Sequence, residues 1–180
     1  MNRRAFIALA LLASPGLNAH TPYRQWKVLR QRYLLVHSTR EDPRGDELAE
    51  RVVAVLGRVL PQANAMVARA PDATRLASLL TTGQAVLAVM RAGEAEDLHS
   101  GQGRFSGFDG RTLRLLLEVE DRALVTTQAL PRHHAWLLAS ALTGDAEGLR
   151  GRVPAADQNP LPIHQGASAF ARGEPLEAQE

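Results

Sequence analysis

Residues 33–90 decide the fold class, and they read YLLVHSTREDPRGDELAERVVAVLGRVLPQANAMVARAPDATRLASLLTTGQAVLAVM. Three short apolar runs in this stretch, at 33–36, 64–68 and 85–90, are typical of strands. The first and the last are apolar enough to be covered on both faces of a sheet. Because helical segments separate the strands and the connections are short, we predict right-handed crossovers, a parallel sheet and an α/β fold.

The first predicted helix carries a single apolar stripe. Asp46 and Glu47 lie at its positive end, and Pro61 stops it. Asp72 caps a second, shorter helix, which Gly83 ends. The stripe of the first helix recurs at spacings of four, three, one, three and one, in Leu48, Val52, Val55, Leu56, Val59 and Leu60.

The pattern changes after residue 90. Residues 91–111 contain five glycines among scattered charges, so we expect a loop-rich excursion with one helical turn near 94–98. The apolar segments 113–119 and 123–128 indicate two strands separated by little more than two acidic residues. Such a short connection predicts one hairpin-joined, antiparallel pair within an otherwise mostly parallel sheet.

The last third of the chain completes one lobe. Pro131 suits the first turn of a helix that Gly144 closes, and Gly, Pro and Asp dominate from there to Ile163. Residues 174–180 have the composition of a disordered tail. We therefore expect a single α/β lobe over 33–173, with helices flanking its sheet.

Residues 1–19 have the architecture of a secretory signal peptide. Arg3 and Arg4 precede the apolar run 5–13, which is shorter than the roughly 20 residues that a membrane span requires. This length disfavours the alternatives, a membrane anchor or an N-terminal core helix. We expect export to the periplasm, no membrane insertion after cleavage, and a polar, extended lead-in at 20–32.

Composition excludes several classes of function. With 180 residues, of which 45% are hydrophobic, the chain can bury a core. Removal of Arg3 and Arg4 with the signal peptide leaves 19 basic and 19 acidic residues, and only 4% of the chain is aromatic. Both features disfavour a nucleic-acid binder. The absence of cysteine excludes disulfides, thiol catalysis and cysteine-ligated zinc.

Four local strings occur in an order that resembles one family. They are DATRLASLLTTGQAVLAV at 72–89, FSG at 105–107 followed by LRLL at 113–116, LVT at 124–126 followed by Leu-Pro at 130–131 and the helix 136–142, and PIHQGASAF at 162–170. The order resembles that of TAXI-type solute receptors, the extracytoplasmic binding proteins of TRAP transporters. This resemblance implies one lobe of a two-lobed periplasmic-binding-protein fold.

The chain departs from that family where its second lobe would begin. In the family, the strand like 113–119 leads into the second lobe and the strand like 123–128 returns from it. Here Glu120 and Asp121 alone join them, so a lobe of about 100 residues is absent. The glycine-rich turn after the first strand keeps only Gly45, among acidic residues that would repel a carboxylate.

Two functions follow from the resemblance. The lobe binds a small, anionic solute, such as a carboxylate or an amino-acid-like molecule, with its cleft completed by a second copy, a membrane permease or another periplasmic protein. Alternatively, ligand capture has been lost and the lobe is a periplasmic accessory module that contacts a partner. We expect neither catalysis nor a cofactor. Hydrolase chemistry in particular is unsupported, because no nucleophile-elbow glycine pattern surrounds any serine.

The candidate ligand-binding residues are Ser38, Thr39, Arg40 and Arg91. The first three follow the first strand at its carboxyl end, where open parallel sheets bind ligands. Ser38 and Thr39 can instead satisfy turn and helix-start amides. Arg91 ends the third strand, where the resemblance implies a polar residue that lines the ligand; it can grip a carboxylate or pair with a nearby acidic residue, Glu94 or Asp97.

The histidines do not predict a metal site. His133 and His134 are adjacent, so on a helix their side chains point about 100° apart. The i, i+4 spacing of a helical zinc motif is missing. We expect structural or surface roles for them and for His37 and His99, and a role for His164 in organising its own loop.

Overall fold

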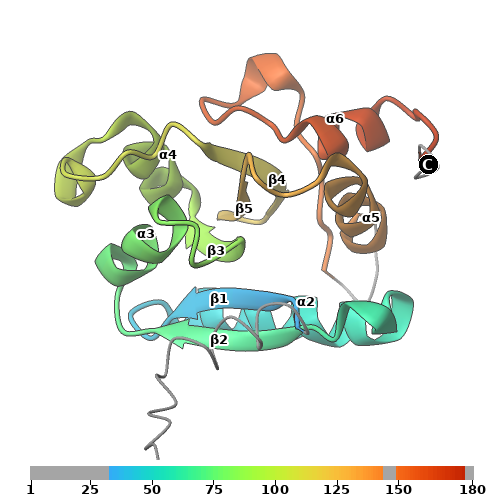
Figure 1. Cartoon of the computed structure of the whole chain (residues 1–180), viewed down its shortest axis with the longest axis horizontal. Helices are drawn as coiled ribbons and strands as arrows, with labels where there is room; N and C mark the ends of the chain where they lie inside the picture. The colour runs from blue at the N-terminus through green and yellow to red at the C-terminus, as the bar shows by residue number, and fades with distance from the viewer. Residues whose placement is uncertain (1–32, 144–148, 177–180) are drawn as a thin grey trace, which may run out of the picture. The chain divides into compact units, whose positions relative to one another are not determined.

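The computed structural model describes residues 33–143 and 149–176. A five-stranded sheet with the order β2-β1-β3-β5-β4 forms its centre (Figure 1). The strands are β1 (Leu35–Thr39), β2 (Met66–Ala70), β3 (Leu87–Arg91), β4 (Leu113–Val119) and β5 (Arg122–Thr127). The helices are α2 (Pro43–Val59), α3 (Ala73–Thr81), α4 (Ala92–Ser100), α5 (Arg132–Leu142) and α6 (Gln165–Ala171), with short 3-10 turns at η1 (Pro61–Ala63), η2 (Gly103–Phe105) and η4 (Ala156–Gln158).

The predicted α/β lobe with a hairpin-joined pair is confirmed. β1 pairs in parallel with β2 and with β3, while β5 pairs antiparallel with both β3 and β4. The hairpin is therefore inserted into the sheet with its returning strand next to β3. Because β4 runs antiparallel to β5, its carboxyl end lies at the same edge of the sheet as those of β1 and β3.

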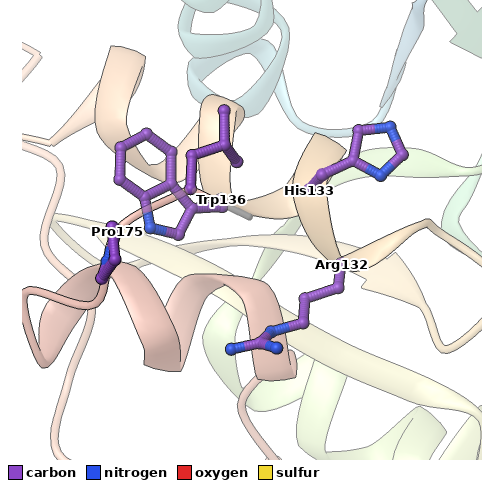
Figure 2. Close-up of a pocket in the computed structure, with 5 residues that line it drawn as sticks. Arg132, His133, Trp136 and Pro175 are labelled. Carbon is purple, nitrogen blue, oxygen red and sulfur yellow. The ribbon is translucent and has the colours of Figure 1, made fainter. Parts of the chain in front are cut away.

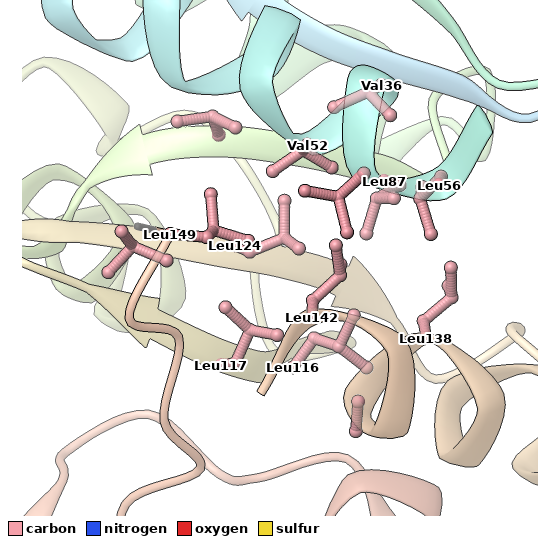
Figure 3. Close-up of a cluster of buried hydrophobic side chains, with 14 of the residues drawn as sticks. Val36, Val52, Leu56, Leu87, Leu116, Leu117, Leu124, Leu138, Leu142 and Leu149 are labelled. Atoms are coloured by element: carbon pink, nitrogen blue, oxygen red, sulfur yellow. The ribbon is translucent and has the colours of Figure 1, made fainter. Parts of the chain in front are cut away.

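Apolar faces on both sides of the sheet hold the lobe together. On one side, α2 and α5 pack on a cluster that includes Val36, Leu87 and Leu124 (Figure 3). On the other side, α3 and α4 cover a second cluster with Phe105 at its centre. Every residue of β1 is buried, which confirms that this strand is covered on both faces. Burial on both sides explains why its sequence does not alternate between polar and apolar residues.

The segment 91–111 differs from its prediction. In place of a loop-rich excursion with one helical turn, it contains the nine-residue helix α4, which begins directly after β3. The only buried side chains of α4 are those of Ala95 and Leu98. Two small contacts with the core leave too weak an apolar stripe for periodicity to reveal the helix.

The outer edges of the two outermost strands, β4 and β2, differ in what pairs with them. The late part of the chain covers β4: Leu115 N–H donates to Pro162 O, and His164 N–H donates to Leu115 O. Glu118 and Arg152 also exchange backbone hydrogen bonds across this edge. On the opposite side β2 is paired only through β1 within the described part of the chain.

Residues 1–32 and 177–180, at the two ends of the chain, lie outside the described residues. The predicted signal peptide and lead-in therefore stay predictions. Of the predicted disordered tail, the part that is described contacts α5: Glu174 O accepts a hydrogen bond from Trp136 Nε1 at 2.9 Å, and Glu174 Oε2 lies 2.9 Å from Arg132 Nη2. Among the described residues, no helix is long and apolar enough to cross a membrane.

Candidate binding edge

The carboxyl ends of β1 and β3 and the first turns of α2 and α4 meet at one edge of the sheet, called here the carboxyl edge. The chain turns after β1 because Asp42 N–H donates to Thr39 O at 3.3 Å, and Pro43 then starts α2. The first peptide N–H groups of a helix carry partial positive charge. An anion at this edge would therefore be bound at the start of α2.

The Asp42 carboxylate of the chain itself occupies this position. It accepts hydrogen bonds from Arg122 Nε at 2.7 Å and from Arg122 Nη2 at 2.8 Å, a bidentate pair in which both side chains are less than a tenth exposed. The carboxylate also accepts from the Gly45 N–H in the first turn of α2. A Cβ at Gly45 would lie 2.5 Å from Asp42 Oδ2, so glycine is what lets the carboxylate reach the backbone.

The electrostatics of Asp42 match this geometry. Partial burial alone would raise its pKa, but the hydrogen bonds and charge of Arg122, the Gly45 N–H and the more distant charge of Arg91 outweigh burial and hold the pKa of Asp42 below its ordinary value. The hydrogen bond with Asp42 raises the pKa of Arg122. Arg122 Nη1 also lies 2.5 Å from Asp121 Oδ2, as an ion pair without hydrogen-bond geometry.

The four residues predicted to bind a ligand lie at or beside this edge. Ser38 and Thr39 are the last two residues of β1, both buried, and Arg40 is the exposed residue that follows. Ser38 Oγ donates to Asp46 Oδ1 at 2.7 Å, so its hydroxyl is bound to a carboxylate in the first turn of α2. Arg40 N–H extends the pairing with β2 by donating to Ala70 O.

Arg91 is half-exposed and lies between two acidic side chains. Its guanidinium is 3.6 Å from Glu94, the pairing that the sequence allowed, and 3.7 Å from Asp42. Across the sheet Arg91 is the register partner of Arg122, so two arginines face each other at the end of β3 and β5. Asp42 contacts both and offsets a repulsion that would otherwise destabilise this strand pair.

Further ion pairs surround the edge. The Asp46 carboxylate lies 2.9 Å from Arg69 Nε. Burial alone would raise the pKa of Asp46, but the hydrogen bond from Ser38 and the hydrogen bond and charge of Arg69 outweigh burial and lower it. Glu41 Oε2 accepts from Ala73 N–H at the start of α3 and lies 3.2 Å from Arg104 Nη1. Arg104 also bonds Glu94. Four cations of the carboxyl edge, Arg69, Arg91, Arg104 and Arg122, are thus already paired with carboxylates of the same chain.

Arg122 is the site residue that sequence reasoning missed. Asp42 belongs to the acidic turn after the first strand, but its partner is 80 residues away in the sequence. One signal was present: Arg122 is the charged first residue of an otherwise apolar segment, RALV, whose members are all buried. A buried arginine requires a partner, and Asp42 is that partner.

A small pocket lies away from this edge, lined by residues of α5 and of the C-terminal segment. The described residues contain no cluster of three or more histidine, aspartate or glutamate side chains placed to hold a metal ion. Figure 2 shows the pocket where the C-terminal segment meets α5, with the Trp136 ring beside Pro175. The Trp136 indole also packs edge-on against Phe170 of α6, so this region joins α5, α6 and the tail.

Compared with models of known protein families and with curated proteins, the chain matches none. Fold and geometry thus define its class: an α/β lobe whose carboxyl edge is occupied by a buried Asp42–Arg122 pair and an outer ring of ion pairs.

Proposed function

We propose that this chain is a periplasmic interaction module, related to the first lobe of a TAXI-type receptor, that contacts a partner protein and does not capture a small anion. The observation that carries the proposal is the position of the Asp42 carboxylate. It accepts from the Gly45 N–H at the start of α2 and takes both donors of Arg122. A free carboxylate would have to displace a tethered one from the same donors.

The hairpin supports the same conclusion. Glu120 and Asp121 connect β4 and β5, at the point where the resemblance implies a second lobe. Two-lobed receptors exclude water from their ligand by closing one lobe over the other. A two-residue turn cannot provide that closure, and the edge it leaves is lined by charged groups suited to a protein surface.

Thermal melts with small carboxylates test the proposal. We expect millimolar formate or acetate to leave the melting temperature of the wild-type protein unchanged. In Asp42→Ala, the same anions should raise the melting temperature, because they can refill the vacant position beside Arg122 and only the folded state offers it. A rise in the wild-type protein with any small carboxylate would overturn the proposal.

Asp72→Ala is the matched control. Asp72 also places a carboxylate at a helix start, where it accepts from Arg75 N–H at 2.7 Å, but that hydrogen bond is exposed and no arginine side chain is paired with it. Loss of Asp72 should therefore lower the melting temperature without creating anion-dependent rescue. Rescue of both variants to the same extent would indicate a general salt effect.

The partner contact has its own test. Arg91 is a half-exposed cation of the carboxyl edge, so Arg91→Glu should change the charge of the proposed contact surface while leaving the buried Asp42–Arg122 pair in place. A periplasmic protein that binds the wild-type domain with a measurable Kd should bind Arg91→Glu several-fold more weakly. Equal affinities would place the contact elsewhere.

Retained solute binding is the second candidate, and one observation favours it. Thr39 and Arg91 converge on the same edge as the start of α2, and Arg91 is exposed enough to turn towards a ligand. In that case a second copy, a permease or another periplasmic protein would complete the cleft. The melts described above separate the two candidates, because only retained binding stabilises the wild-type protein.

A further inference from the structure

The outer edge of β2 is the open edge of the sheet within the described part of the chain (Figure 1). Met66 N–H donates to Leu34 O, and Ala70 O accepts from Arg40 N–H, so these residues direct their backbone groups towards β1. In a parallel pair, alternate residues of a strand face the neighbour. Val67 and Arg69 therefore direct their N–H and C=O groups outward, away from the sheet.

Nothing within β2 blocks a further strand. The segment MVARA contains neither proline nor an irregular register with β1, and its one charged side chain is neutralised within the chain. Arg69 Nε donates to Asp46 at 2.9 Å and Arg69 Nη2 donates to Glu50 at 2.5 Å. Natural edge strands are often protected by a bulge, a proline or a charged side chain. β2 has neither of the first two, and its one charged side chain, Arg69, is held in ion pairs within the chain.

Apolar side chains are exposed around the same strand. The large exposed hydrophobic residues of the described chain are Tyr33, Val59, Met66 and Leu176. Met66 begins β2, and Val59 ends the helix that leads to it through η1. Tyr33 precedes Leu34, whose N–H donates to Ala63 O just before β2. Three of the four therefore lie around one end of β2, and Met66 lies on the strand to which a partner strand would pair.

We infer that β2 pairs antiparallel with β2 of a second copy of this chain, about a twofold axis at Ala68. In this register Val67 of each copy lies opposite Arg69 of the other, and both residues direct their backbone groups outward. Each such pair exchanges two hydrogen bonds, so the five-residue strand is complementary to itself. Met66 lies opposite Ala70 and Ala65 opposite Pro71, which places apolar residues against apolar residues.

The covered edge of β4 decides which assembly results. Because backbone groups at 152 and 162–164 already pair with β4, β2 of one copy cannot add to β4 of the next. Among the described residues, the only open sheet edge that a second copy offers is its own β2. Pairing of identical edges closes a twofold dimer with a ten-stranded sheet and does not propagate into a filament. This inference is independent of the proposed function, which concerns the carboxyl edge.

The absence of cysteine makes the register directly testable. About the proposed axis, the two copies of Ala68 form a pair without mutual hydrogen bonds, with Cα atoms about 4.5 Å apart. That separation lies within the range a disulfide spans. Ala68→Cys should therefore form a disulfide-linked dimer on mild oxidation of the full chain. The yield of this dimer should stay the same when the protein is diluted until random collisions no longer cross-link it.

Met66→Cys is the matched control on the same strand. Position 66 is more exposed than position 68, so random collisions would cross-link it at least as readily. In the proposed register its two copies are four residues apart along the strands, about 14 Å, which is too far for a disulfide. We expect Met66→Cys to stay largely uncross-linked under conditions that cross-link Ala68→Cys.

Mass measurement completes the test. Light scattering of the wild-type chain should give twice the monomer mass. Val67→Pro removes an N–H that faces outward and no bond to β1, so it should halve the mass while retaining a cooperative melt. A monomeric wild-type chain, including one whose residues 20–32 cover β2, would overturn the inference. So would a dimer that cross-links through position 66 and not through position 68.

Discussion

At the scale of residues, the pair Asp42–Arg122 determines what the carboxyl edge can do. Both side chains are buried, and two hydrogen bonds of 2.7 and 2.8 Å join them. A buried ion pair is stable only when its hydrogen-bond geometry is good, and removal of one partner leaves the other as an uncompensated buried charge. The pair therefore joins the start of α2 to β5 and blocks the donors that an anion would use.

Arg122→Met should be strongly destabilising. Loss of the guanidinium leaves Asp42 without its main partner, and the expected loss in the free energy of unfolding is about 3–5 kcal/mol. The double variant Asp42→Asn, Arg122→Met should lose clearly less than the sum of the two single variants, because neither residue is then left unpaired. Urea denaturation of all four proteins measures this coupling, and additive losses would contradict it.

The same pair predicts the response to acid. Because the folded-state pKa of Asp42 is lowered from its ordinary 3.8, the carboxylate contributes stability that is present above that value and is lost as pH falls through the folded-state pKa. Below about pH 4, the wild-type protein should therefore lose more stability than Asp42→Asn does. Chemical denaturation at pH 5 and pH 3 measures the difference between the two proteins.

His164 predicts a second, separate pH dependence. Its Nδ1 accepts from Gly166 N–H at 3.1 Å, so Nε2 carries the proton and donates to Leu130 O at 3.0 Å. Burial, and to a lesser degree the charge of Arg114, lowers the pKa of His164 from its ordinary 6.5, although the Leu130 hydrogen bond opposes the shift. Protonation would cost the hydrogen bond from Gly166.

The sign of this effect follows from the lowered pKa. The contribution of His164 is complete above pH 6.5 and is lost as pH falls from 6.5 towards the folded-state pKa, because the unfolded chain binds the proton more readily. Between pH 7 and pH 5 the wild-type melting temperature should fall more than that of His164→Gln, whose side chain does not titrate. Equal slopes for the two proteins would show that His164 does not control this range.

At the scale of elements, close contact between α5 and α6 depends on one glycine. A Cβ at Gly166 would lie 2.1 Å from Arg132 O and 2.8 Å from Ala135 Cβ, so only glycine allows the first turn of α6 to approach α5. The sequence suggested a local string here, and the structure shows its physical role. Helix α6 has only seven residues and depends on this contact for its stability.

Gly166→Ala should therefore separate the two helices and destabilise the protein by about 1–3 kcal/mol, the usual cost of overpacking. Gly57→Ala in α2 is the matched control, because nothing lies within 4 Å of a Cβ there. That change should be neutral or stabilising by up to about 1 kcal/mol, since alanine favours helix more than glycine does. The two variants are compared by their denaturant midpoints. Equal losses of stability in both would show that the loss comes from the backbone and not from packing between the helices.

At the scale of the whole molecule, the inserted hairpin couples the two halves of the sheet. β5 lies between β3 and β4, and its Leu124 belongs to the cluster that α2 and α5 cover. Leu124→Ala should lower the free energy of unfolding by about 2–5 kcal/mol. Circular dichroism and tryptophan fluorescence should report the same lowered midpoint, because both halves unfold together. Separate transitions would show that the halves are independent.

Much of the architecture was predictable from local sequence. The buried runs, the stripe of α2 and the cap at Asp72 identified the strands and two helices, because each signal involves residues close together in the chain. Helix α4 was missed because it buries only Ala95 and Leu98. The pairing of Arg91 with Glu94 was predictable because the two residues are only three positions apart in the sequence.

By itself, the sequence determined the α/β class, the hairpin and the acidic character of the turn after β1. Only the tertiary structure decided that β5 enters the sheet beside β3 and that Arg122 reaches Asp42 across 80 residues. It also decided that, among residues 33–143 and 149–176, the outer edge of β4 is covered while that of β2 is open. Periodicity and capping act within one or two helical turns and can be read along the chain. Strand order and ion pairing depend on which distant segments share a surface, and that is decided when the core is packed.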